Sequence, residues 1–184
     1  LDTYDHVTLR STFELDYPHV ELIFCCDQPN DPAVPVVRLL MAEYPLVRAK
    51  LLIGRDPVTS NPKLNNLIKG WPHVRAEWVI MADCNVLMPS DYVQRLLSAW
   101  RPRTGIVCSP PIGHLPTGFW AELECAFLNN DQARWQLTAD RIGLGFAQGK
   151  SMLYRRSVID EAGGIRALAT EPKLLLLDEP AAGM

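Results

Sequence analysis

The sequence predicts an α/β domain in which a mostly parallel sheet is flanked by helices. Short apolar runs alternate along the chain with segments whose apolar residues recur at helical spacing. This alternation favours right-handed crossovers between parallel strands. The 184 residues, 48% hydrophobic and 21% charged, are enough for one domain with its own core.

The first half of the chain predicts two strands and two helices. Residues 20–26 (VELIFCC) form a buried strand that ends in a polar turn. Asp31 is placed to cap the next helix, with Pro32 in its first turn. The positions expected to face inward on that helix are Val34, Val37, Leu40, Met41 and Tyr44. Residues 50–54 then predict a second strand, and residues 63–71 a short helix.

The second half continues the pattern. Strands are expected at residues 77–82, 105–108 and 151–154, and the first of them stops at Asp83. Ser90 is predicted to cap a helix after the first of these strands. The inward positions of that helix are Val93, Leu96, Leu97 and Trp100. A longer helix is expected from residue 117 to about 136, and a last helix ends at the glycines of positions 163 and 164.

Composition and charge exclude several classes of protein. The net charge of −3 predicts no nucleic-acid partner, because no basic face is present. No apolar run approaches the roughly 18–20 residues that span a bilayer. The five cysteines are odd in number and include no C-x-x-C spacing, which argues against a disulfide framework or a zinc site. Buried free thiols in a reducing compartment are expected instead, which favours the cytosolic side.

Two predicted strands end in an aspartate, Asp27 and Asp83, at the edge where α/β sheets bind ligands. Asp83 and Asn85 place two oxygen-bearing side chains two residues apart on a turn, which suits one hard cation. Such a cation neutralises a diphosphate as it leaves. The alternative is that both aspartates are ordinary turn or cap residues.

The segment 61–67 (NPKLNNL) opens a predicted helix and carries Lys63 near its start. Helix amino ends favour anions, and a lysine adds a point charge suited to phosphate. The alternative is a surface lysine beside two asparagines that cap the helix locally. Asp27 is a candidate to accept hydrogen bonds from a nucleobase or a ribose, with a strand-end turn as the alternative.

Five segments, in this order, resemble the ceramide glycosyltransferases and their bacterial branch. They are DYPHVELIFCCDQPNDPAVPVVRLL, NPKLNNL, VIMADCNVLMPSDYVQRLL, CSPPIGHLPTGFWAELECAFLN and GLGFAQGKSMLYRRSVIDEAGGIRALA, within residues 1–169. The resemblance implies a GT-A fold, a nucleotide-sugar-binding α/β domain. It also implies transfer of a sugar from a UDP-sugar to a lipid hydroxyl, ceramide above all, with a divalent cation, Mg or Mn.

The same resemblance implies roles for individual residues. Asp27 would contact the uridine, Lys63 would lie near the nucleotide, and Asn66 would support that turn. Asp83 and Asn85 would hold the metal, with Asn85 standing where many relatives carry a second Asp. The junction between donor and acceptor would be lined by Gln148, Gly149 and Lys150. The run 132–135 (QARW) is one residue too short for the family's Gln-x-x-Arg-Trp signature, so we interpret it as helix surface plus a core Trp135.

Both ends depart from the family pattern, which predicts a GT-A domain truncated at both ends. The first family strand is missing before Leu1. After the GGIRALA segment the family has a Glu-Asp pair whose Asp is the general base, and this chain has Glu171-Pro172 instead, so the catalytic residue is unknown. Residues 167–184 resemble the Walker B segment of a branched-chain amino-acid ABC transporter ATPase, so 170–184 is predicted to be a foreign tail joined to the domain of residues 1–169.

The predicted function is therefore hexosyl transfer from a UDP-sugar to a ceramide-type lipid, at the cytoplasmic face of a membrane that the chain would reach through segments outside it. Without the general base, this chain is expected to turn over negligibly. The alternatives are a transferase acting on a hopanoid or polyprenyl lipid, and a nucleotide-binding fragment without turnover.

Overall fold

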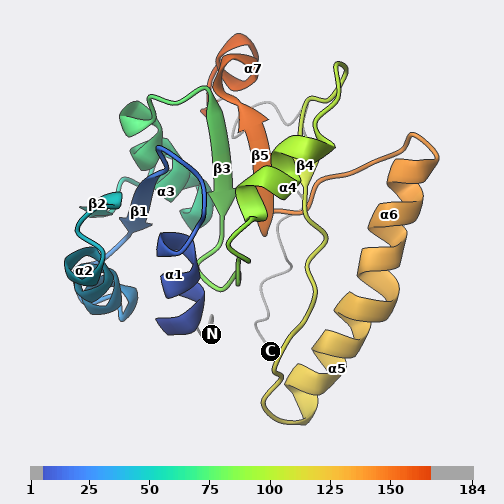
Figure 1. Ribbon diagram of the computed structural model, residues 1–184, viewed down its shortest axis with the longest axis horizontal. Coiled ribbons are helices and arrows are strands. Elements are labelled where there is room, and N and C mark those ends of the chain that lie inside the picture. Colours follow the sequence, from blue (N-terminus) through green and yellow to red (C-terminus); the bar gives the residue numbers. More distant parts are fainter. Residues whose placement is uncertain (1–5, 167–184) are drawn as a thin grey trace.

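The computed structural model describes residues 6–166 and confirms an α/β architecture (Figure 1). Five strands are assigned in this part of the chain: β1 (Glu21–Cys26), β2 (Arg48–Ile53), β3 (Trp78–Ala82), β4 (Val107–Cys108) and β5 (Ser151–Arg155). The α-helices are α1 (His6–Phe13), α2 (Ala33–Glu43), α3 (Pro62–Gly70), α4 (Tyr92–Ala99), α5 (Phe119–Phe127), α6 (Ala133–Arg141) and α7 (Arg156–Glu161). A 3-10 turn, η1 (Trp71–His73), follows α3, and a π-helical segment, η2 (Leu128–Gln132), joins α5 to α6.

The strands form two sheets, and the expectation of a mostly parallel arrangement is met in only one of them. Strands β1 and β2 pair in parallel through the α2 crossover, as the alternating pattern predicts. In the second sheet the order is β3-β5-β4, and both pairings of β5 are antiparallel. The reason is that the chain leaves β4, runs through α5 and α6, and returns to the same end of the sheet, so β5 enters in the opposite direction.

Three apolar clusters hold the layers together. The first packs α1 and α2 against the β1–β2 sheet around Leu40, which is fully buried. The other two lie on opposite faces of the second sheet. Met152 and Tyr154 face α3 and α7, whereas Leu153 between them faces α4. This period of two is the alternation that a strand buried on both faces requires.

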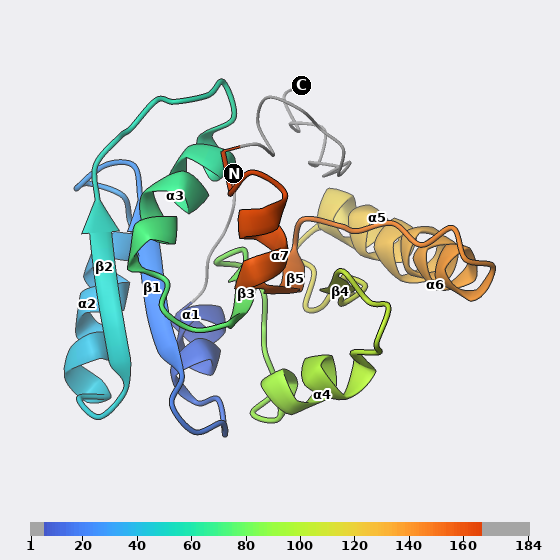
Figure 2. The same ribbon diagram turned by 90° about the horizontal axis from the view of Figure 1, so that it is seen from above.

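The helical segment α5–η2–α6 is longer than predicted and stands to the side of the sheets (Figures 1 and 2). The loop before it is held by the Asn129 amide, which both accepts from the Gly113 N–H (2.8 Å) and donates to the Gly113 carbonyl (3.1 Å). Large apolar side chains are exposed along the segment: Phe119, Trp120, Leu123, Phe127, Trp135 and Leu137. The interpretation of Trp135 as a core residue is therefore wrong, because α6 turns Ala133 and Gln136 inward instead.

The two predicted helix caps have different outcomes. The Asp31 carboxylate accepts a hydrogen bond from the Ala33 N–H (2.8 Å), so Asp31 makes the predicted capping bond at the start of α2. Ser90 does not cap α4. That helix begins one residue later, after Asp91, and the Ser90 carbonyl instead accepts from the Asp16 N–H (2.8 Å). None of the helices within residues 6–166 is both long enough and apolar enough to cross a membrane.

Candidate functional site

The antiparallel pairing of β3 and β5 brings two predicted site segments together. The pairing ends with Ala82 opposite Ser151. The next residues on each chain, Asp83 and Lys150, then face one another, and the Asp83 N–H donates to the Lys150 carbonyl (3.0 Å). Segments 67 residues apart in sequence therefore meet at the carboxyl end of β3, where α/β sheets bind ligands.

Lys63, Asp83 and Lys150 form a charged group at this position. Lys63 Nζ lies 2.6 Å from Asp83 Oδ1, and Lys150 Nζ lies 3.5 Å from Asp83 Oδ2. Lys63 Nζ also donates to the Gly149 carbonyl (2.6 Å). Two ammonium groups around one carboxylate leave a net positive charge in a partly buried place, which attracts an anionic ligand. We call these three residues the Lys63–Asp83–Lys150 group.

Local hydrogen bonds at the start of α3 place Lys63. The Asn61 side chain caps the helix by accepting from the Leu64 N–H (3.1 Å), with Pro62 in the first turn. The buried Asn65 amide fixes the preceding loop through Thr59, accepting from its N–H (2.8 Å) and donating to its carbonyl (2.9 Å). Asn61 and Asn65 therefore stabilise the start of α3 locally, which is the role that the alternative interpretation gave to two asparagines. Lys63 itself is not a solvated surface lysine, because it reaches across to Asp83.

Asn66 and Asn85 each bury a side-chain oxygen, Oδ1, that has no hydrogen-bond partner among the described residues. A buried polar atom left unpaired costs about 1–3 kcal/mol, so such atoms call for a ligand or a bound water. Asn85 Oδ1 and the Asp83 carboxylate are two oxygen donors of the type that Mg²⁺ and Mn²⁺ prefer, so they fit such an ion. Residues 6–166 contain no cluster of three His, Cys, Asp or Glu side chains that would hold a metal by itself.

Gln148 lies at the same place, immediately before Gly149. Its side chain is buried, and neither of its amide atoms has a partner among the described residues. Its main chain is bound to Cys108 on β4: the Gln148 N–H donates to the Cys108 sulfur (3.1 Å), and the thiol donates to the Gln148 carbonyl (3.1 Å). Burial raises the pKa of the Cys108 thiol, so this cysteine is a neutral packing residue.

Gln136 is a residue at this place that the sequence reasoning missed. It lies on α6 and is buried, and its side chain is near enough to the Cys108 thiol to lower the pKa of that thiol; its Oε1 has no partner among the described residues. The signal that was available in the sequence is weak. Gln136 stands between Trp135 and Leu137, and the helical pattern alone favours the apolar residues as the inward ones.

Asp27 is not bonded to this group within the described residues. It follows β1 directly, and no hydrogen bond or ion pair connects it to Lys63, Asp83 or Lys150 in the contacts that the structure gives. Lys69 lies nearby and ties the ends of β1 and β2 together by donating to the carbonyls of Cys26 (2.7 Å) and Gly54 (2.5 Å). The role of Asp27 in binding uridine therefore remains a prediction.

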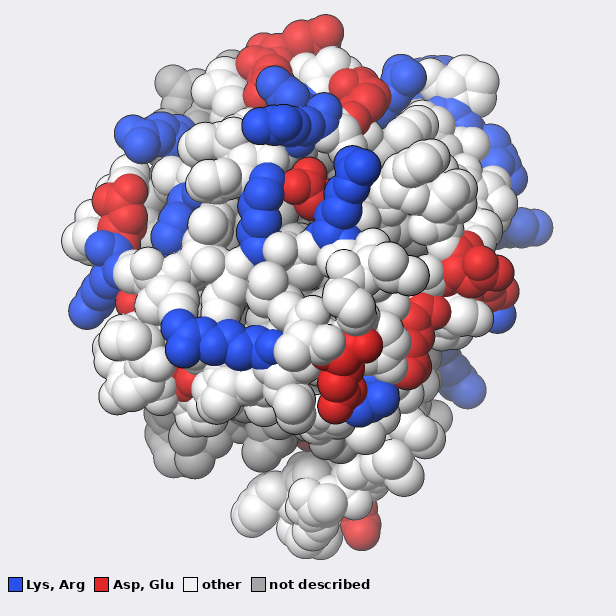
Figure 3. Space-filling model, turned by 60° about the vertical axis from the view of Figure 1, so that its left-hand side comes forward, with Lys and Arg blue, Asp and Glu red and all other residues white. Residues whose placement is uncertain are grey.

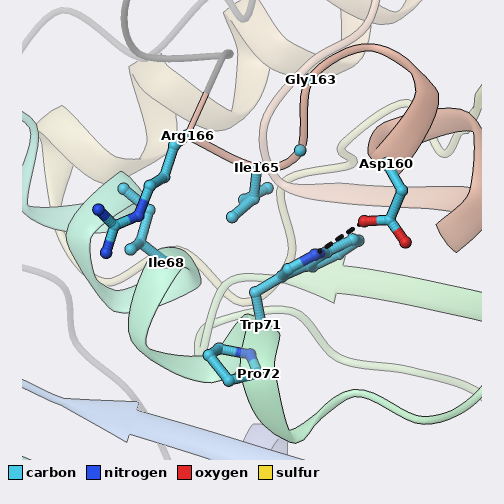
Figure 4. A pocket seen from close by; sticks show the side chains of 8 residues that line it. Ile68, Trp71, Pro72, Asp160, Gly163, Ile165 and Arg166 are labelled. Carbon is cyan, nitrogen blue, oxygen red and sulfur yellow. Dashed lines mark hydrogen bonds between the residues drawn. The ribbon is translucent and has the colours of Figure 1, made fainter.

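A hollow of about 280 Å³ lies at the other end of α3 (Figure 4). Trp71 forms one wall, and its indole N–H donates to Asp160 Oδ1 (3.2 Å) across the floor. Ile68 and Ile165 line the remainder. Trp71 follows Lys63 by eight positions, along α3 and into η1, a rise of roughly 12 Å, so this hollow is distinct from the Lys63–Asp83–Lys150 group.

Positive and negative side chains lie beside one another over the face shown in Figure 3, with neutral surface between the groups. Elsewhere in the described structure, two lysines flank one carboxylate in the Lys63–Asp83–Lys150 group. A small cationic site of this kind fits a compact anion rather than an extended polyanion.

The sequence profile of glycosyl transferase family 21 matches residues 1–171. The chain belongs to this family. Ceramide glucosyltransferase 1 of Caenorhabditis elegans is 30% identical over 159 residues, which cover 85% of this chain and 34% of that protein. The ceramide glucosyltransferase of Komagataella phaffii is 29% identical over 199 residues, which cover 95% of this chain and 39% of that protein. The chain thus spans about a third of the length of these relatives.

A solved structure supports the fold of this family 21 chain. It is a mannosyltransferase from Pyrobaculum calidifontis in complex with GDP-Man and Mn²⁺, with a TM-score of 0.62 and 17% identity over 89% of this chain and 44% of that one. At this identity the likeness shows the fold alone, and it confirms the predicted GT-A-like α/β class. The predicted Walker B-like tail, residues 170–184, lies outside the described residues.

Proposed function

We propose that this chain is the donor-binding part of a glycosyltransferase that moves a hexose from a UDP-sugar to the hydroxyl of a ceramide-type lipid. The observation that carries the proposal is the Lys63–Asp83–Lys150 group at the carboxyl end of β3. Membership of glycosyl transferase family 21 supports sugar transfer, and the relatives named ceramide glucosyltransferases support the substrate class.

The chemistry of the group follows from its charges. When a sugar leaves a nucleotide diphosphate, negative charge builds up on the diphosphate oxygens, and nearby cations stabilise it. The Lys63 and Lys150 ammonium groups are held in place by Asp83 and by the Gly149 carbonyl, so little reorganisation is needed for them to bind a diphosphate. Asp83 and Asn85 would hold the divalent cation, which supplies further positive charge for the same purpose.

The surface of the α5–η2–α6 segment supports a lipid acceptor. Phe119 and Trp120 are exposed by 69% and 78%, and further apolar side chains follow along the segment. Exposed aromatic and aliphatic side chains in this number are typical of surfaces that contact a membrane or an apolar ligand. We place the site at the cytoplasmic face of a membrane as part of this proposal, and the odd number of cysteines without C-x-x-C spacing supports it. The expectation that the thiols are buried is wrong for most of them, because Cys26 is buried, Cys84 is exposed and the other three are intermediate.

The proposal is tested by titrating UDP-glucose, UDP and ATP into the chain in the presence of Mn²⁺ and following tryptophan fluorescence. We expect UDP and UDP-glucose to bind and ATP to bind much more weakly. The variant Asp83→Ala is expected to abolish binding, because it releases both lysines and removes an oxygen ligand. Equal affinity for ATP, or full binding by Asp83→Ala, would contradict the proposed donor site.

A transfer assay addresses the acceptor. Radiolabelled UDP-glucose is incubated with ceramide in detergent micelles, and glucosylated lipid is quantified. We expect turnover to be negligible in this chain, because the family's general base is not found at its expected place after residue 169. Robust transfer would show that another group of this chain removes the acceptor proton.

A further inference from the structure

The inward face of α6 has the reverse of the usual polarity. Ala133 and Gln136 are its buried residues, and Gln136 is only 5% exposed. Trp135 and Leu137, on either side of Gln136, are 69% and 60% exposed. A helix normally turns its apolar residues toward the protein body. Apolar packing therefore does not explain why α6 directs a glutamine inward. A hydrogen-bonding role for the side chain at that position does explain it.

Gln136 and Gln148 meet at Cys108. The Gln136 side chain lies close enough to the Cys108 thiol to lower the pKa of that thiol, and the Cys108 sulfur makes both hydrogen bonds to the main chain of Gln148. The two side chains leave three buried polar atoms without partners among residues 6–166: Gln136 Oε1, Gln148 Oε1 and Gln148 Nε2. Burial of three unpaired atoms on two neighbouring side chains is unfavourable in the free chain, so it points to a ligand that completes their hydrogen bonds.

The unpaired atoms define the chemistry of this ligand. Two of them are acceptors and one is a donor, and neither side chain is charged. The diphosphate of a nucleotide sugar carries no proton at neutral pH and offers only acceptors, so it does not satisfy the two Oε1 atoms. A hydroxyl group both donates and accepts, and several hydroxyls on one ring satisfy all three atoms. The site therefore suits a hydroxyl-bearing group.

We propose that Gln136 and Gln148 together bind the hydroxyls of a substrate next to the diphosphate position, a site we call the glutamine pair. This inference rests on the proposed function. Gln148 directly precedes Gly149 and Lys150. The Gly149 carbonyl accepts from Lys63 Nζ, and the Lys150 carbonyl accepts from the Asp83 N–H. The glutamine pair thus adjoins the Lys63–Asp83–Lys150 group, where the hexose of the donor and the hydroxyl-bearing head of the lipid acceptor both belong.

The test measures binding of UDP, UDP-glucose and a short-chain ceramide in micelles by calorimetry, for the 184-residue chain and for Gln136→Leu and Gln148→Leu. Leucine has nearly the volume of glutamine and no polar atoms. The matched control is Gln132→Leu, one turn earlier on the same helical segment and not fully buried. We expect Gln136→Leu to weaken UDP-glucose about 3–10-fold, to leave UDP unchanged, and to keep or raise the melting temperature.

The remaining outcomes are also decisive. If only ceramide binding weakens, the site exists and its ligand is the acceptor head. The inference is overturned if both glutamine variants bind UDP-glucose and ceramide as well as Gln132→Leu does. It is also overturned if they melt at a markedly lower temperature, because the two amides are then structural. An unmodified chain that binds neither UDP nor UDP-glucose would contradict the proposed function itself.

Discussion

Replacing Lys63 by methionine separates the role of its charge in the fold from its role in the donor site. Lys63→Met removes the 2.6 Å ion pair with Asp83 and the 2.6 Å hydrogen bond to the Gly149 carbonyl, while the apolar part of the side chain is kept. Within residues 6–166, Asp83 then keeps its ion pair with Lys150, at 3.5 Å.

The magnitude follows from the exposure of the two partners. A hydrogen bond to a charged group contributes about 1.5–3 kcal/mol, and less where solvent screens it. The Lys63 and Asp83 side chains are 33% and 25% exposed, so we expect a total loss of about 1–2 kcal/mol in the free energy of unfolding. For a chain of this length that lowers the melting temperature by about 2–8 °C. If the ammonium group also contacts the diphosphate, affinity for UDP-glucose falls about 10–100-fold.

The matched control is Lys50→Met. Lys50 forms a 2.7 Å ion pair with Glu21, and the two side chains are 39% and 27% exposed, values close to those of the Lys63 pair. Both variants are melted by circular dichroism and titrated with UDP-glucose. Lys50→Met is expected to lose a similar or smaller amount of stability and to bind UDP-glucose normally. Equal affinity of the two variants would refute the assignment of Lys63 to the donor site, whatever their melting temperatures.

Two further predictions concern the same region and the cysteines. In Asn85→Asp a second carboxylate stands beside Asp83, so the free protein is expected to melt at a lower temperature than the unmodified chain. Mn²⁺ is expected to raise the melting temperature of this variant more than that of the unmodified chain. Melting curves with and without MnCl₂ check this, and an unchanged response to Mn²⁺ would remove Asn85 from the metal site. Burial raises the pKa of the Cys26 thiol to about 11, so its reactive thiolate is nearly absent at pH 8 and accumulates only as the pH approaches that value. Maleimide labelling followed by mass spectrometry at pH 8 is therefore expected to modify the exposed Cys84 first, and early modification of Cys26 would contradict its burial.

Local patterns in the sequence predicted most of the individual elements. The strand at Glu21–Cys26 and the helix at Ala33–Glu43 agree with the prediction to within a few residues, because a short apolar run and an apolar repeat of about 3.6 are properties of neighbouring residues. The prediction failed where a long-range contact outweighed local preference. Ser90 is a good capping residue, yet its carbonyl is bound by Asp16 and the helix starts after Asp91.

The sequence by itself determined the α/β class, the carboxylate and amide oxygens of Asp83 and Asn85 after a buried strand, and Lys63 in the first turn of a helix. The tertiary structure decided which of them meet. Because β5 runs antiparallel between β3 and β4, Lys150 lies opposite Asp83, and Lys63 reaches both Asp83 and Gly149. The direction of a strand depends on where the preceding connection returns to the sheet, and no local pattern encodes that. For the same reason only the folded chain shows that Gln136, rather than Trp135, faces inward beside Gln148.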